Sequence, residues 1–423
     1  MTLTVWLGLA VFGVTYGLIA TERLHKTVAA LAGGVAMIVL GVVTQDRAFE
    51  EIDFNVIFLL TGMMILAGII RRTGIFGWLA VRSARFAGGD PYRILVVMSV
   101  ITAVASAFLD NVTTVVLVGP ITLFLAARMG MNPTPFIIAE VLASNIGGAA
   151  TLIGDPPNIL IGSAANIDFT SFAFNMGPLA AIVLVVFLVF ARWLFRDELH
   201  VDPAMRASLL SLDEREMIVD PRLLRKSVAV LGLTLVGFLL HGAFHLEPAT
   251  IALAGAVVLM IVARADPHEV LRDVEWPTLF FFIGLFMVIA GVIEIGMIEA
   301  IATALTDVTG GTLAAGSFVM LWLSAVLSAI VDNIPYTATM IPVVEQLSES
   351  HGGSQALWWA LAAGADLGGN ATIIGASANV ILASMAEREG HPISFVTFFR
   401  YAAPVTIGSI LIAMAYIWLR YLL

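Results

Sequence analysis

The sequence predicts an all-α polytopic membrane protein made of two inverted-topology repeats of five spans each. Each repeat includes a broken helix and carries a re-entrant helical hairpin, which gives about ten transmembrane helices plus two hairpins. Three observations predict this fold class. Of the 423 residues, 60% are hydrophobic and only 12% are charged. Apolar runs long enough to cross a bilayer recur from end to end. The two halves of the chain also match each other in sequence, which indicates an internal repeat.

Two pairs of matching segments carry the repeat. The segment SAFLDNVTTVVLVGP (106–120) matches SAIVDNIPYTATMIP (328–342), and IGGAATLIGDPPNIL (146–160) matches LGGNATIIGASANVI (367–381). The offset is 222 residues for the first pair and 221 for the second. The same spacing relates glycines and phenylalanines earlier in the two halves, so the repeat covers nearly the whole chain.

Hydropathy divides both halves into the same series of elements. In the first repeat, residues 1–196, we expect spans at about 3–20, 27–44 and 54–71, a hairpin at about 92–128, a broken helix at about 135–165 and a last span at 178–196. In the second repeat, residues 226–423, we expect spans at about 226–241, 249–264 and 276–293, a hairpin at about 312–347, a broken helix at about 355–385 and a last span at 402–420. Residues 197–225 form a solvated linker.

The distribution of basic residues favours hairpins over extra crossings. Two apolar segments meet at Asp110, and they could be two crossings or one re-entrant hairpin. Hairpins leave 19 of the 21 Lys and Arg residues on one face and only Arg47 and Arg420 on the other. An extra crossing in each half would scatter the arginines over both faces. The positive-inside rule makes the basic face cytoplasmic. We therefore expect a multi-pass inner (plasma) membrane protein with both termini outside and the linker in the cytoplasm.

The composition also excludes several kinds of site. The chain contains no cysteine, so disulfides, thiolate metal sites and thiol redox relays are excluded. We expect no catalytic residues, no metal centre, no cofactor and no nucleic-acid partner. The lipid bilayer is the expected environment for nearly the whole chain.

Four helix breaks at repeat-related places predict one central binding site. They are DNVTT (110–114), GDPPN (154–158), DNIPY (332–336) and GASAN (375–379). Unpaired backbone groups persist at membrane depth only where protein or a water-filled cavity surrounds them. Each break exposes helix ends whose free N–H and C=O groups can hold an ion or a substrate. A single break could be a kink, but four related breaks favour a site.

Five carboxyl groups within apolar segments are candidates for carrying protons. Asp110 and Asp332 occupy equivalent hairpin tips, Asp155 and Asp366 lie in the broken helices at non-equivalent positions, and Glu140 lies in an apolar run. An ionisable side chain at the bilayer centre costs about 2.5–3.5 kcal/mol on insertion scales, so it is a functional candidate. The alternative for the two tip aspartates is helix capping, which is compatible with proton carriage.

These motifs closely resemble those of the arsenite and antimonite permease and melanosomal P-protein branch of the ion transporter superfamily. The resemblance implies a scaffold and a transport region built from the hairpins and broken helices, an elevator movement and a homodimer. By this resemblance the candidate substrate- and ion-binding residues are Asp110, Asn111, Thr113, Thr114, Gly154, Asp155, Asn158, Asp332, Asn333, Ser377 and Asn379. We add Asn370, which lies in the second broken helix.

Two departures from symmetry and from the family pattern bear on the substrate. Dicarboxylate transporters of the superfamily tend to carry Ser-Asn-Thr at the hairpin tips, whereas this chain has Asp-Asn at both. Two tip aspartates would repel a dianion. Glycine and asparagine recur in both broken helices, but Asp155 is replaced by Ala376 in the second half. We therefore expect the shared residues to build the cavity and Asp155 to make it asymmetric.

The leading functional hypothesis is a secondary active transporter, not an enzyme, that couples proton entry to efflux of trivalent arsenite or antimonite. A soluble ATPase subunit is a possible partner. A neutral trihydroxide offers donors and acceptors that Asn, Thr and carboxyl groups can match. The alternative is a sodium/proton antiporter. An anion transporter or channel is less favoured because basic residues are few within the spans. An intramembrane aspartyl protease is also less favoured, since the aspartates lie in repeat-related breaks.

Overall fold

The structure is a computed structural model that describes all residues except 1, 22, 200, 202–212 and 245. Within the described residues it is helical throughout, without strands. The first repeat contains α1 (Leu3–Thr21), α2 (Lys26–Val39), α3 (Gln45–Glu50), α4 (Phe54–Arg71), α5 (Ile75–Phe86), α6 (Pro91–Leu109), α7 (Asn111–Met129), α8 (Thr134–Gly148), α9 (Pro156–Ala164) and α10 (Phe169–Leu194). Twelve residues of the expected linker 197–225, namely 200 and 202–212, lie outside the described residues.

The second repeat follows the same order. A short 3₁₀ helix, η1 (Glu214–Met217), precedes it. Its helices are α12 (Pro221–Phe244), α13 (Pro248–Ala263), α14 (Pro267–Arg272), α15 (Trp276–Glu294), α16 (Met297–Thr309), α17 (Leu313–Ile330), α18 (Asn333–Ser350), α19 (Ala356–Gly368), α20 (Ser377–Arg388) and α21 (Phe395–Ile417). Two 3₁₀ turns, η2 (Gly369–Ala371) and η3 (Ile373–Gly375), join α19 to α20, and a π-helical turn, η4 (Trp418–Leu422), ends the chain.

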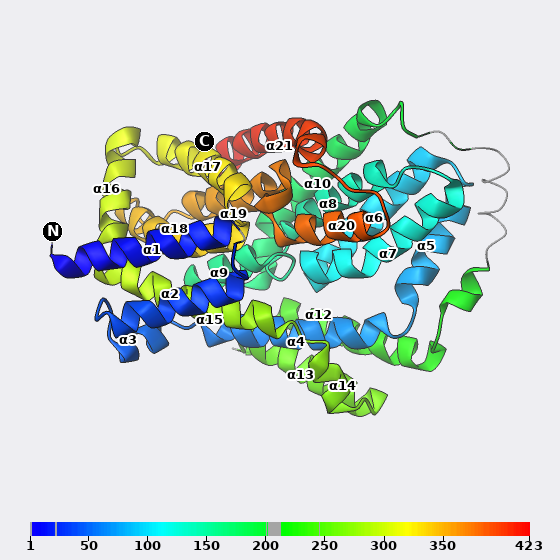
Figure 1. Ribbon diagram of the computed structural model, residues 1–423, viewed down its shortest axis with the longest axis horizontal. Coiled ribbons are helices and arrows are strands. Elements are labelled where there is room, and N and C mark those ends of the chain that lie inside the picture. Colours follow the sequence, from blue (N-terminus) through cyan, green and yellow to red (C-terminus); the bar gives the residue numbers. More distant parts are fainter. Residues whose placement is uncertain (1, 22, 200, 202–212, 245) are drawn as a thin grey trace.

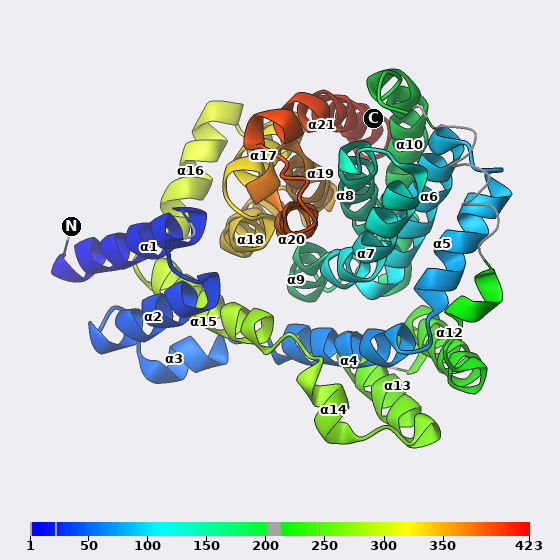
Figure 2. The same ribbon diagram turned by 45° about the vertical axis from the view of Figure 1, so that its right-hand side comes forward.

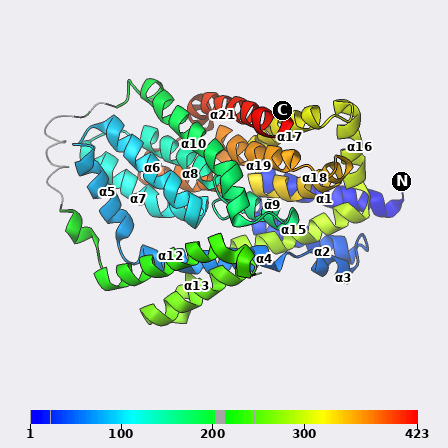
Figure 3. The same cartoon turned by 180° about the vertical axis from the view of Figure 1, so that it is seen from behind.

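The predicted fold class is confirmed. Among the described residues, nine helices are long and apolar enough to cross a membrane, and three of these are arms of the hairpins α6–α7 and α17–α18. The other six are full spans. The shorter apolar helices α2 and α13 add two, and the broken helices α8–α9 and α19–α20 add two more, which makes ten spans. The two hairpins approach the middle of the molecule from opposite ends (Figures 1 and 3).

The helices form two layers. One layer contains α1 to α4 and α12 to α15, and the other contains the hairpins, the broken helices, α10 and α21 (Figures 1 and 2). The short helices α5 and α16 connect the layers in sequence, and neither was expected from hydropathy. Each begins after a glycine with a positive φ, Gly74 at 81° and Gly296 at 71°. These glycines are repeat partners, so the same left-handed turn redirects the chain in both halves.

Small residues at the interface between the repeats make contacts that follow the repeat offset. Gly62 on α4 packs against the backbone of Ala252 on α13, and Gly284 on α15 packs against the backbone of Ala30 on α2. The offset of 222 that relates the two glycines also relates the two alanines. A Cβ on either glycine would stand within 3 Å of backbone atoms of the facing helix. Close backbone packing through small residues is the usual basis of helix association in membranes.

Helices α10 and α21 begin earlier than the sequence analysis placed them. We expected their spans to start at residues 178 and 402, but α10 begins at Phe169 and α21 at Phe395. Pro178 and Pro404 lie inside the helices. Asp168 and Ser394 cap the earlier starts by accepting hydrogen bonds from Ser171 N and Thr397 N. Proline removes only one backbone donor, so a capped and packed helix can continue through it.

One ion-pair cluster ties the end of α4 to the second repeat. Arg72, just beyond α4, donates to Asp273 at 2.8 Å and to Glu269 at 2.9 Å. The side-chain hydrogen bond from Arg72 to Asp273 raises the pKa of the guanidinium above its ordinary value. Arg72 is thus held as a cation at the end of the span.

Candidate functional site

Both hairpin tips are capped by their own aspartates. Asp110 accepts hydrogen bonds from the Thr113 backbone N at 2.8 Å and from the Thr113 hydroxyl at 2.6 Å. Asp332 accepts a hydrogen bond from the Ile334 backbone N at 3.1 Å. Asp110 also has a φ of 74°, which L residues rarely adopt, whereas Asp332 has a φ of −39°. Such strain is typical of functional positions, and here it distinguishes two residues that the repeat makes equivalent.

The shared asparagines of the broken helices support the exposed backbone. The Asn158 side-chain N donates to the Gly148 and Thr151 carbonyls, both at 3.1 Å. Its repeat partner Asn379 makes the same two bonds to Gly369 O and Thr372 O at 2.8 Å. Each asparagine thus satisfies carbonyls that the helix break leaves without an intrahelical donor. The amide nitrogens of Asn158 and Asn379 therefore donate to backbone carbonyls of the protein.

Asp155 joins the two hairpins behind their tips. Its carboxylate accepts a hydrogen bond from Asn111 at 2.6 Å and another from Asn333 at 3.2 Å. These asparagines are repeat partners, one at each tip. Asp155 is fully buried. One carboxylate of the first repeat therefore contacts both re-entrant elements.

A network of buried amides continues from this point to the second broken helix. The Asn145 side-chain N donates to Asn370 Oδ1 at 3.0 Å and to Asn379 Oδ1 at 2.9 Å. Asn111 also donates to Asn145 Oδ1 at 3.2 Å. Asn145 was not among the candidates, although it occupies the repeat position of Asp366, and that equivalence is the signal that could have found it. The network holds the two broken helices together.

Asp366 presents unpaired acceptors in this buried region. It is fully buried, and neither carboxyl oxygen receives a hydrogen bond of ordinary length from the residues that the structure describes. The amide of Asn158 lies beside it, and Asn158 Oδ1 also lacks a donor there. Asp155 is close enough to Asp366 for the two carboxyl groups to repel each other. The arrangement suits a bound proton or a cation that prefers oxygen ligands.

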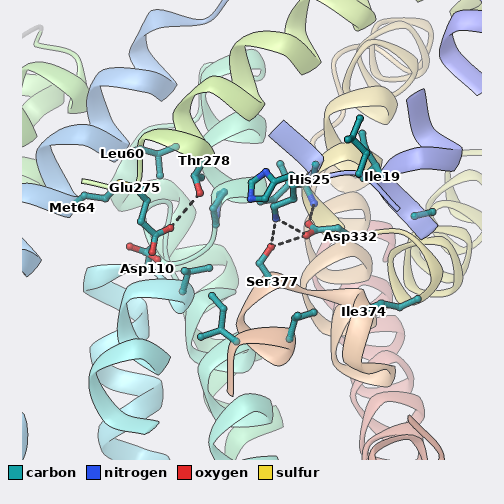
Figure 4. Close-up of a pocket in the computed structure, with 18 of the residues that line it drawn as sticks. Ile19, His25, Leu60, Met64, Asp110, Glu275, Thr278, Asp332, Ile374 and Ser377 are labelled. Atoms are coloured by element: carbon teal, nitrogen blue, oxygen red, sulfur yellow. Dashed lines mark hydrogen bonds and ion pairs between the residues drawn. The ribbon is translucent and has the colours of Figure 1, made fainter. Parts of the chain in front are cut away.

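A cavity of about 400 Å³ lies between the two layers, where both hairpin tips meet α2 and α15 (Figure 4). Its described lining includes three acidic side chains, Asp110, Asp332 and Glu275, and two basic ones, His25 and Lys26. Asp110 lies beside Glu275, whereas Asp332 lies beside Ser377 (Figure 4). The lining therefore offers both hydrogen-bond donors and acceptors, with an excess of carboxyl groups.

Lys26 is a site residue that the sequence analysis missed. We grouped it with the basic residues of the cytoplasmic face. In the structure its Nζ lies 3.1 Å from Asp332 Oδ2 and donates to Ser377 Oγ at 2.5 Å. Ser377 in turn donates to Asp332 at 2.7 Å. A lysine next to a predicted span end is usually interfacial, so no local pattern distinguished it.

The predicted site residues fall into three groups. Asp110, Asp332 and Ser377 line the cavity. The buried network behind it contains Asn111, Asp155, Asn158, Asn333, Asn370 and Asn379. The others lie elsewhere. Thr113 bonds to Asp110, Thr114 is buried in α7, and Gly154 packs against Gly148. Glu140 accepts a hydrogen bond from Thr122, and Asp366 is fully buried beside Asn158.

Comparison with known proteins identifies relatives along nearly the whole chain. The model of a family described as citrate transporter matches residues 16–364. An uncharacterized transporter of Mycobacterium tuberculosis is 46% identical over 97% of this chain and 97% of its own length. The P protein of Homo sapiens is 35% identical over 96% of this chain, which spans 59% of that protein.

A solved structure supports the fold. The YdaH transporter of Alcanivorax borkumensis, whose crystal structure is described as having an unusual topology, aligns with a TM-score of 0.54. The alignment covers 99% of this chain and 97% of that one, at 15% sequence identity. At this identity the likeness concerns the fold alone.

Proposed function

The chain belongs to the citrate transporter family, and we propose that this member of the family exports trivalent arsenite or antimonite as the neutral hydroxide, coupled to proton entry. That it is a multi-pass membrane transporter follows from the family and from its apolar helices. The substrate and the coupling ion are our proposal. The single observation that carries it is the excess of carboxyl groups around the cavity.

The charge of the site favours a neutral or cationic solute over citrate. Asp110, Asp332 and Glu275 line the cavity together with Lys26 and His25, and Asp155 lies in the network behind it. Citrate carries several negative charges near neutral pH. Uncompensated like charges across a binding site cost several kcal/mol. The citrate in the family's description is therefore not the substrate that we propose for this chain.

A neutral trihydroxide matches the polar groups that are present. It can donate to the carboxylates of Asp110 and Asp332 and accept from the ammonium group of Lys26. The cavity of about 400 Å³ is ample for so small a molecule. The absence of cysteine suits release, because thiolates would hold trivalent arsenic. Asp110, Asp332 and Asp366 are the proposed proton carriers, together with Asp155 and Glu140.

The remaining parts of the proposal concern movement and assembly. We propose that the layer of hairpins and broken helices moves past the other layer as an elevator, with the repeats bounded at residues 1–196 and 226–423. We place the protein in the inner membrane, with both termini outside and the linker 197–225 in the cytoplasm. A homodimer and a soluble ATPase subunit complete this proposal.

Sodium/proton antiport is the second candidate, and the unpaired oxygens at Asp366 favour it. Asp366 contributes two carboxyl oxygens and Asn158 one amide oxygen, all buried and without a hydrogen bond of ordinary length from the described residues. Hard cations prefer oxygen ligands of this kind. A sodium ion and a proton would then compete for the same carboxylates.

Transport into everted vesicles tests both candidates. An imposed proton gradient should drive arsenite accumulation that an Asp332→Asn variant lacks. Sodium-dependent dissipation of the same gradient, without arsenite movement, would establish antiport instead. Arsenite accumulation equal to that of the Asp332→Asn control would refute the leading proposal.

A further inference from the structure

We propose that Lys26 is a tethered cation that competes with the coupling ion for Asp332 and Ser377, and so links ion occupancy to the release of the second hairpin. This inference rests on the proposed ion-coupled transport and concerns the same site. Lys26 lines the cavity, and the proposed function uses it only as a hydrogen-bond donor to the substrate.

The geometry places the Lys26 ammonium where a small cation would bind. Its Nζ contacts Asp332 Oδ2 at 3.1 Å and Ser377 Oγ at 2.5 Å, which are two oxygen ligands from two elements. The Lys26 side chain is 30% exposed and that of Asp332 is 13% exposed, so the pair faces the cavity. A proton or sodium ion that enters the cavity can reach the same oxygens. Two cations cannot share one carboxylate without repulsion, so each displaces the other.

Lys26 joins the two layers of the fold. It is the first residue of α2, whereas Asp332 lies at the tip of α17–α18 and Ser377 begins α20. The ring of Phe281 on α15 lies 5.2 Å from Nζ and adds a cation–π contact on the Lys26 side. The ammonium therefore stays with α2 and α15 when Asp332 is neutralised. Breaking the ion pair removes a direct bond between the layers.

The pair belongs to one repeat only. The repeat partner of Lys26 is Pro248, that of Ser377 is Pro156, and that of Asp332 is Asp110. Asp110 thus lacks an equivalent lysine and lies near Glu275 instead. Lys26 is therefore not part of what the two repeats share. Its ion pair holds the second hairpin to the other layer, and the first hairpin has no equivalent ion pair among the described residues.

Other charged groups face the pair from every side of the cavity. Asp110 comes from the first hairpin, Glu275 from the start of α15 and His25 from the turn before α2. Asp155 interacts electrostatically with both Asp332 and Asp110 from behind the tips. Protonation of any of these groups changes the field at Asp332. A pH response by itself therefore does not identify Lys26, and the test needs variants that change Lys26 alone.

A neutral contact between the same layers provides the matched control. The Tyr16 hydroxyl on α1 donates to Pro335 O at 2.9 Å and also contacts the Thr339 hydroxyl on α18. These contacts hold the same hairpin without a charge. The repeat partners of Tyr16 and Thr339 are Phe238 and Leu117, so the first hairpin lacks this bond as well. Tyr16→Phe loosens the hairpin and leaves the ion competition unchanged.

The experiment uses a single reporter cysteine in the full chain, which contains no natural cysteine. Ala338→Cys places the thiol on a buried position of α18 and leaves the contact between Tyr16 and Thr339 in place. The rate of maleimide labelling in reconstituted vesicles is measured with and without sodium and at two pH values. In this parent and in Tyr16→Phe, the coupling ion should raise the rate about tenfold. In Lys26→Gln, the rate should be high and independent of the ion, and Lys26→Arg should restore the dependence.

The outcomes separate this inference from the proposed function. A Lys26→Gln variant whose labelling still depends on the ion as in the parent would overturn the inference. If Lys26→Gln does not fold, Lys26→Met takes its place, because it also removes only the ammonium charge, and the same two outcomes apply. Labelling does not require a substrate, so arsenite transport can fail while the role of Lys26 stands. Conversely, intact arsenite transport with unchanged labelling would refute only the role of Lys26.

Discussion

Asn333, at the tip of the second hairpin, donates a hydrogen bond to Asp155 in the broken helix of the first repeat at 3.2 Å. The bond joins the two repeats at the centre of the molecule. Its counterpart from the first hairpin, Asn111 to Asp155, is shorter at 2.6 Å. Both hairpins therefore depend on one carboxylate, although the repeat provides two equivalent positions. This asymmetry leads to the first prediction.

Asp155→Ala should impair proton coupling more than folding. Alanine fits the local backbone, because Ala376 occupies the equivalent position and has similar φ and ψ values. The substitution removes a proposed proton carrier that contacts both hairpins, so proton-driven flux should fall at least about tenfold. The stability should change less, because relief of the cost of burying a carboxyl group offsets the two lost hydrogen bonds. Flux in vesicles and the thermal midpoint in detergent measure the two effects. Ala376→Ser is the control, and equal flux in both variants would contradict the prediction.

Asn158→Ala and Asn379→Ala should both destabilise the protein, and Asn379→Ala should do so more because it also removes the acceptor of Asn145. Each removes two hydrogen bonds to carbonyls in a helix break. A buried polar group left unsatisfied costs about 1–3 kcal/mol. The thermal midpoint should fall in both variants, whereas Asn55→Ala, at an exposed position, should leave it unchanged. A fall in only one variant would argue against equivalent supporting roles.

Gly62→Val and Gly284→Val should each disrupt the contact between the repeats. The added side chain would meet the backbone of Ala252 in one case and of Ala30 in the other. Overpacking of this kind costs about 1–3 kcal/mol. The yield of monodisperse protein in detergent should fall for both. Gly13→Val is the matched control, because nothing lies within 4 Å of a Cβ at Gly13.

Asp110→Asn should abolish coupled transport without unfolding the hairpin. The asparagine side chain can still accept the hydrogen bond from Thr113 N, so the helix cap is kept. The charge that faces the cavity is lost. We expect proton-driven flux at background level and a thermal midpoint close to that of the parent. Full activity of Asp110→Asn would show that this aspartate serves only as a cap.

The periodic and repeated features were predictable because they depend on local chemistry. The offset between the halves located both hairpins, both broken helices and the glycines that later proved to be at the repeat interface. The shared asparagines Asn158 and Asn379 were recognised, but their role was not. We expected them to bind substrate, whereas their amide nitrogens support the backbone. Spacing along the chain does not reveal which way an amide points.

The sequence by itself determined the all-helical membrane fold and the four helix breaks, because hydropathy, glycine and proline act over a few turns of helix. It also determined the repeats, because similar segments can be matched at any separation along the chain. Only the tertiary structure decided which polar groups meet. Lys26 and Asp332 are 306 residues apart, and Asn145 and Asn379 are 234 apart. Such pairs form when two layers pack together, and the packing depends on the shape of many apolar side chains at once. No local pattern encodes it.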